Sequence, residues 1–136
     1  MQLINNALLD QVTRQAQESP RLRMNYNLHE SLDDEVQRLL NALEPGTLLP
    51  IHRHKDTDET YILLRGRIRI IFYDESGKQL ETIELNPQKG QYGVNIKAGE
   101  WHTLEVLESG SVIFEIKKGP YKPFEKEDII APASQS

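Results

Sequence analysis

Cysteine is absent from the 136 residues, and basic side chains are in the minority. Without cysteine the chain forms neither disulfides nor thiolate metal sites, which fits a reducing compartment. Aspartate and glutamate number 21 against 16 lysines and arginines, and the resulting formal net charge of −5 disfavours a nucleic-acid partner. No apolar run approaches the roughly 20 residues that span a bilayer, and the first residues do not resemble a signal peptide. We therefore expect a cytoplasmic protein that binds neither nucleic acid nor a membrane.

The length favours one domain of residues 1–136, because it is too short for two ordinary ones. An N-terminal helix is predicted over residues 3–18, where apolar residues recur at helical spacing until Pro20. Apolar residues continue at helical spacing over residues 32–43, which predicts a second helix. Between the two, residues 21–29 alternate between polar and apolar, as in a β-strand.

The rest of the chain is dominated by strand and turn patterns. Seven strands are predicted, over residues 47–52, 59–64, 67–73, 79–85, 91–96, 101–107 and 111–117. Short strands separated by turns at intervals of about 8 to 12 residues indicate a sandwich or a barrel. We divide the domain into a helix–strand–helix extension (1–45), a barrel (46–118) and a C-terminal tail (119–136). Three prolines in the tail predict an extended path over the barrel surface that loosens after Pro132.

The polar side of the first predicted strand has an unusual composition. It carries Arg23, Asn25, Asn27 and His29, whereas solvated strand faces usually hold threonine, lysine and glutamate. Arginine pairs well with carboxylate or phosphate, and His29 is a candidate general base. Recognition of a ligand and an ordinary solvated face both remain open as explanations.

Three of the four histidines lie where a curled sheet could gather them. His52 and His54 are two residues apart, so they share one face of a strand. Glu59 begins the next strand, and His102 lies at the start of a later one. Three imidazoles and one carboxylate suit a divalent transition metal, which would also offset the cost of burying them. Surface histidines beside a salt-bridged glutamate are the alternative, and spacing alone does not exclude it.

The region from Gly46 to Val106 resembles the cupin family. The first cupin motif is a glycine, five residues, His-x-His, three or four residues, a glutamate, six residues and a glycine. This chain matches it throughout with Gly46, His52, His54, Glu59 and Gly66. The second motif is matched at Gly99 and His102, whereas Lys97, Val106 and Gln91 replace its proline, asparagine and leading glycine.

A further resemblance extends over more of the chain. A strand rich in arginine and asparagine, then the segment from Asp33 to Gly46, and then Pro50-x-His52-Arg53-His54 are similar to the WbuC-type cupin-fold metalloproteins. That group is associated with bacterial surface-polysaccharide gene clusters. The resemblance implies a mainly β protein with a double-stranded β-helix (a jelly-roll barrel) and one or two short N-terminal helices. It also implies one divalent metal held by His52, His54, Glu59 and His102.

The expected function follows from this metal site. Four protein ligands on a six-coordinate ion leave open positions, as in catalytic sites. Iron, manganese, nickel, cobalt and zinc are all candidates. We expect an isomerase- or epimerase-like enzyme that acts on a sugar or sugar derivative in surface-polysaccharide metabolism, with Arg23, Asn25 and Asn27 binding the substrate. An Fe(II) dioxygenase and a non-catalytic small-molecule binding module are the alternatives, and a homodimer is expected.

Overall fold

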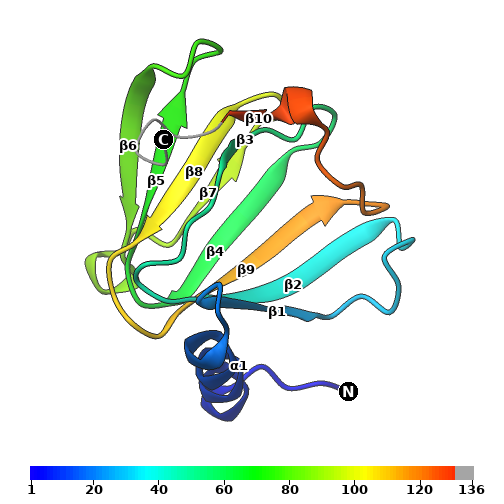
Figure 1. Cartoon of the computed structure of the whole chain (residues 1–136). Helices are drawn as coiled ribbons and strands as arrows, with labels where there is room; N and C mark the ends of the chain where they lie inside the picture. The colour runs from blue at the N-terminus through cyan, green and yellow to red at the C-terminus, as the bar shows by residue number, and fades with distance from the viewer. Residues whose placement is uncertain (131–136) are drawn as a thin grey trace.

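The computed structural model describes residues 1–130, and it confirms a mainly β fold with one N-terminal helix. Two five-stranded antiparallel sheets face each other (Figure 1). The first sheet contains, in spatial order, β1 (Arg23–Asn27), β2 (Val36–Leu43), β9 (Ser111–Lys118), β4 (Glu59–Arg65) and β7 (Gly93–Ile96). The second contains β10 (Ile129–Ile130), β3 (Ile51–His52), β8 (Trp101–Val106), β5 (Ile68–Tyr73) and β6 (Gln79–Leu85).

The main apolar core fills the space between the two sheets. Tyr61 and Leu63 of β4 point inward from the first sheet, and Ile68 and Ile70 of β5 point inward from the second. Their outward neighbours are more exposed, as the alternation of a strand requires. The core extends up to the polar residues of the interior, since Phe72 and Ile96 are register partners of His102 and Glu59.

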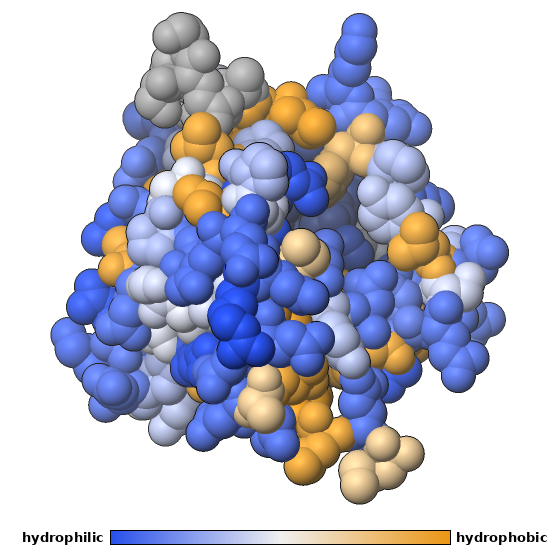
Figure 2. Space-filling model, turned by 60° about the horizontal axis from the view of Figure 1, so that its bottom comes forward, coloured by the Kyte–Doolittle hydropathy of each residue, from blue (hydrophilic) through white to orange (hydrophobic). Residues whose placement is uncertain are grey.

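Helix α1 (Asn6–Glu18) packs on the outer face of the first sheet, beneath β1, β2 and β9 (Figure 1). Asn5 caps it, because its side-chain oxygen accepts a hydrogen bond of 3.1 Å from the Leu8 amide. Val12 and Ala16 are fully buried against Leu40 of β2. The surface on this side of the molecule is mainly hydrophilic, with small separate apolar patches (Figure 2). Across residues 1–130, no helix is both long and apolar enough to cross a membrane.

The second predicted helix, over residues 32–43, is wrong. Residues 36–43 form strand β2, which pairs with β1 on one side and β9 on the other. Leu43 faces the core between the sheets, whereas Leu40 and Ala42 face α1. A strand buried on both faces is an almost continuous apolar run, and over this length such a run also fits helical spacing. The N-terminal residues therefore contribute two strands to the same sheet as β4 and β9.

The tail crosses the open end of the sandwich after β9. It runs from the first sheet to the second, where β10 pairs with β3 and places Ile129 opposite His52 (Figure 1). A single turn of 3-10 helix, η2 (Lys126–Asp128), precedes β10. The predicted loosening after Pro132 falls on residues 131–136, which lie outside the described part of the chain.

Candidate metal centre

Three of the four predicted ligands converge at the open end of the sandwich. His52 on β3 and His102 on β8 are register partners in the second sheet, and Glu59 begins β4 in the first sheet. One ligand atom from each of the three side chains lies within 4.8 Å of the others. All three residues are buried. This group of two imidazoles and one carboxylate has the geometry and the donor types to hold a metal ion.

Both buried histidines are oriented by the backbone. Nδ1 of His52 lies 2.9 Å from the Pro50 carbonyl oxygen, and Nδ1 of His102 lies 3.0 Å from that of Glu100. A carbonyl only accepts, so each Nδ1 must donate its hydrogen. In a neutral imidazole this leaves the lone pair on Nε2, the nitrogen that faces the centre. The same arrangement fixes the tautomer of histidines that bind metals.

Two of the converging atoms lack a hydrogen-bond partner within residues 1–130. These are Nε2 of His102 and Oε1 of Glu59, which are buried and 3.4 Å apart. With Nε2 unprotonated, both atoms present lone pairs, and two facing acceptors in a buried site are unfavourable. A proton on Nε2, which would make His102 a charged donor to Glu59, or a metal cation placed between the two atoms would satisfy both. The donor set is of the kind that holds a divalent metal.

His54, the fourth predicted ligand, lies beside this group. It follows the end of β3, and its Nε2 is 3.2 Å from Oε2 of Glu59. Its ring centroid is 5.4 Å from that of His52. His54 thus contacts the second carboxylate oxygen, while His102 faces the first. His54 is not among the three residues whose ligand atoms converge.

The pKa values of His52 and Glu59 favour metal binding over protonation. Burial, with a contribution from His102, lowers the pKa of His52 to about 4. His52 therefore stays neutral near pH 7 and keeps its lone pair. Burial alone would raise the pKa of Glu59, but His102 and His54 outweigh it and hold the pKa well below its ordinary value. Glu59 is therefore an anion, the form that ligates a metal.

The interior also holds a second buried carboxyl group, Glu115 of β9, which sequence reasoning missed. It is the register partner of Tyr61, and it accepts a hydrogen bond of 3.2 Å from the Asn41 side chain. Burial and the neighbouring Glu59 raise the pKa of Glu115 to about 7. A charged residue within the apolar stretch from Val112 to Ile116 is the signal that could have identified it. Such a carboxyl can exchange a proton near neutral pH.

The predicted substrate-binding strand lies at the edge of the first sheet. Nη1 of Arg23 donates to the Leu48 carbonyl oxygen at 2.8 Å, so its guanidinium group contacts the loop before β3. Asn25 and Asn27 are exposed on the same side of β1, opposite to Met24, which packs toward α1. None of the three residues contributes to the group of converging ligand atoms in the described chain. Their role in substrate binding stays a prediction.

His29 is buried at the start of the loop after β1, away from the open strand face that was predicted to present it. Its Nδ1 lies 3.1 Å from the amide nitrogen and 3.0 Å from the carbonyl oxygen of Arg38. Its Nε2 is buried and has no hydrogen-bond partner among the described residues. These contacts anchor the ring to the start of β2. Its role as a general base stays a prediction.

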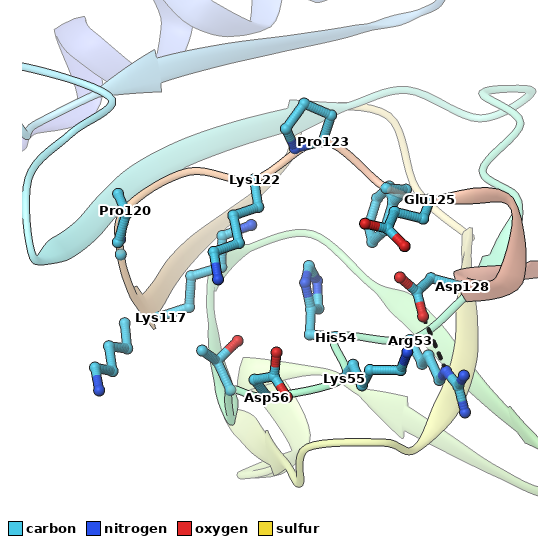
Figure 3. A pocket seen from close by; sticks show the side chains of 14 residues that line it. Arg53, His54, Lys55, Asp56, Lys117, Pro120, Lys122, Pro123, Glu125 and Asp128 are labelled. Atoms are coloured by element: carbon cyan, nitrogen blue, oxygen red, sulfur yellow. Dashed lines mark hydrogen bonds and ion pairs between the residues drawn. The ribbon is translucent and has the colours of Figure 1, made fainter.

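The tail closes one side of the candidate centre. The ring of Phe124 lies 4.9 Å from that of His52 and 5.1 Å from that of His54, centroid to centroid. Arg53, between the two histidines, binds the tail through Asp128 at 3.1 Å (Figure 3). A cavity of about 500 Å³ separates the tail from the loop after β3, and His54 and Phe124 line it. Sequence reasoning did not assign these tail residues to the site, because they approach it only through the tertiary fold.

Comparison with solved structures identifies the fold. KdgF from Halomonas sp. matches 77% of this chain and 84% of its own, with a TM-score of 0.59 and 15% identity. A cupin superfamily protein from Desulfitobacterium hafniense DCB-2 matches 71% of this chain and 76% of its own, with a TM-score of 0.54 and 22% identity. The capsular polysaccharide assembling protein CapF from Staphylococcus aureus matches 83% of this chain with 32% of its own length. The TM-score is 0.63 and the identity is 17%. At these identities the likeness shows a shared cupin fold.

Comparison of sequences gives the family. No curated protein matches the chain. Residues 4–85 match the family model described as Domain of unknown function (DUF6016). This match includes α1, the first six strands in full and the His-x-His and Glu59 part of the candidate centre. The chain is therefore a member of the DUF6016 family, built on a cupin fold.

Proposed function

We propose that this protein is a metal-dependent enzyme that acts on a sugar or sugar derivative. The observation that carries the proposal is the buried group of His52, Glu59 and His102, in which two atoms have no hydrogen-bond partner among the described residues. The cavity beside His54 supports it, because a site that only stabilised the fold would not need an adjoining space. His54 completes the proposed ligand set.

Different residues of the protein would bind the substrate and transfer a proton. The metal, when bound, supplies Lewis acidity toward a carbonyl or a pair of hydroxyl groups. Glu115 sits on the interior face beside Tyr61, with a pKa near neutrality, so it can take or return a proton in an isomerase- or epimerase-like reaction. His29 is the second candidate for this role. Asn25 and Asn27 on the exposed face of β1 would contact sugar hydroxyls, and Arg23 would hold the neighbouring loop in place.

The structural comparisons support a role in carbohydrate chemistry. CapF is described as a capsular polysaccharide assembling protein, and the WbuC-type resemblance of the sequence also indicates surface-polysaccharide metabolism. We therefore place the proposed reaction in that metabolism, in the cytoplasm. An Fe(II) dioxygenase and a binding module without turnover are the competing functions, and the experiment below separates all three.

The metal is tested first, by elemental analysis of protein purified without chelator. We expect about one divalent ion per chain, and loss of most of it in H52A, H102A and E59Q, because each variant removes one ligand from a small set. E81Q on the exposed strand β6 is the matched control and should keep its metal. Equal metal content in all four variants would reject the centre.

Activity is tested with the metal-loaded protein. Sugars, sugar phosphates and nucleotide sugars are screened for conversion by NMR, and oxygen uptake is recorded in parallel. Conversion of a sugar without oxygen uptake is the expected result, with a loss of turnover in E115Q at unchanged metal content. Oxygen-dependent turnover would replace the proposal by the dioxygenase, and saturable binding without turnover would replace it by the binding module.

A further inference from the structure

The cavity beside the candidate centre lies between two segments that are far apart in the sequence. One wall is the loop from Arg53 to Thr57, and the other is the tail from Gly119 to Glu125 (Figure 3). His54 and Phe124 belong to this cavity and also contact the converging ligands. Its volume of about 500 Å³ lies within the range of sites for small molecules. A molecule bound there would reach the metal centre through His54.

The walls of this cavity carry more positive than negative side chains. The cationic residues are Arg53, Lys55, Lys117, Lys118 and Lys122. The anionic residues are Asp56, Glu125 and Asp128. The excess of five over three contrasts with the net charge of −5 for the whole chain. A cavity of opposite sign to the protein as a whole concentrates anions locally.

Two of the cations are already neutralised by partners in the tail. Arg53 pairs with Asp128 at 3.1 Å, and Lys55 pairs with Glu127 at 2.8 Å. Lys117, Lys118 and Lys122 take part in none of the ion pairs formed within residues 1–130. These three amino groups are outside the ion pairs, so their charges are available to an anion that enters the cavity.

Lys117 and Lys122 approach the cavity from different elements. Lys117 is half-buried on β9 and is the register partner of Glu59, so it adjoins the candidate metal ligand. Lys122 belongs to the tail on the other wall (Figure 3). A lysine amino group is a compact charge with several donors, which suits phosphate or carboxylate oxygens. A divalent metal on Glu59 would add further positive charge at the inner end.

We propose that Lys117 and Lys122 bind an anionic group, a phosphate or a carboxylate, on the molecule that occupies this cavity. The inference deepens the proposed function, on which it rests, because it defines the substrate as an acidic or phosphorylated sugar. The anionic group contacts the lysines, while the neutral part of the molecule extends along Phe124 toward His54. The tail is thereby part of the binding site, since it supplies Lys122 and one wall.

The test compares three probes by isothermal titration calorimetry. Glucose 6-phosphate carries a phosphate, glucuronate carries a carboxylate, and glucose carries neither. We expect at least one charged probe to bind about tenfold more tightly than glucose, and K117Q and K122Q each to weaken that binding by about tenfold. K117R keeps the charge and should retain most of the affinity. K89Q, which removes an exposed lysine outside the cavity wall, should bind like the unchanged protein.

The titrations are run on metal-loaded and on chelator-treated protein, with metal content measured for every variant. Lysine-dependent binding of a charged probe in the chelated protein supports the anion site even where the proposed enzyme function fails. The relative affinities of the two charged probes identify which anion the site takes. The inference is overturned if both charged probes bind no better than glucose, or if K117Q and K122Q bind them as tightly as the unchanged protein.

Discussion

At the scale of single residues, the candidate centre depends on hydrogen bonds that leave lone pairs free. The carbonyl oxygens of Pro50 and Glu100 hold His52 and His102 in the tautomer that binds a metal. Both carbonyls lie two residues before the histidine that they orient, so this part of the geometry is local. The positions of the histidines in the sequence therefore carry much of the information about the ligand set.

Glu115 provides a prediction about the pH dependence of stability. Its pKa of about 7 in the folded protein exceeds the ordinary value of 4.5, so the folded state binds more protons between these pH values. The free energy of unfolding should therefore fall as the pH rises from about 4.5 to 7. Glutamine cannot ionise, so E115Q should be more stable than the unchanged protein at pH 8, by up to about 3 kcal/mol.

Urea unfolding of chelator-treated protein at pH 5 and pH 8 measures this difference. At pH 5 the difference should be below about 1 kcal/mol, because Glu115 is protonated in the folded state and pH 5 lies only just above its ordinary pKa of 4.5. E105Q serves as the control, since Glu105 is exposed and pairs with Arg69 on the surface. A stability difference between E115Q and the unchanged protein that is the same at both pH values would contradict the assignment of a buried carboxyl that ionises near pH 7.

At the scale of elements, β2 and the tail show where local patterns mislead. Residues 36–43 fit helical spacing, yet they are a strand because β1 and β9 pair with them and α1 covers their outer face. The tail was expected to cross the barrel surface, but nothing in its own sequence indicated that Phe124 would contact His52 and His54. Both outcomes depend on partners that are distant in the chain.

The tail should control how fast the centre exchanges its metal. Asp128 binds the Arg53 side chain and, through its carbonyl oxygen, the Arg53 amide at 3.1 Å. D128N weakens the side-chain contact, so we expect a chelator to remove the metal several times faster, with little change in metal affinity. The rate is followed by the absorbance of a coloured chelator. E127Q breaks only the exposed pair with Lys55 and should change the rate little, and equal rates for the three proteins would show that the tail does not limit access.

At the scale of the whole molecule, the centre joins the two sheets. His52 and His102 come from the second sheet and Glu59 from the first, so a metal would link the two sheets beside the apolar core. A ligand that binds only the folded state stabilises it by mass action.

Adding metal should therefore raise the thermal midpoint of unfolding. At a free metal concentration about 1,000 times the dissociation constant, the stabilisation should be about 4 kcal/mol. Differential scanning calorimetry with and without metal measures this stabilisation, and H52A should show no rise.

The homodimer stays a prediction. Light scattering after gel filtration would show twice the chain mass of 15.7 kDa if it is correct.

The sequence by itself determined the fold class and proposed the four ligands, because the cupin spacing brings His52, His54 and Glu59 to neighbouring strand ends. Only the tertiary structure decided that residues 36–43 are a strand, that Glu115 lies in the interior, and that Lys117 and Lys122 share a cavity with His54. The physical reason is the range of the interactions involved. Periodicity and short spacings depend on contacts within a few residues. The burial of a side chain and the charges around it depend instead on which strands pair and on where the C-terminal tail packs.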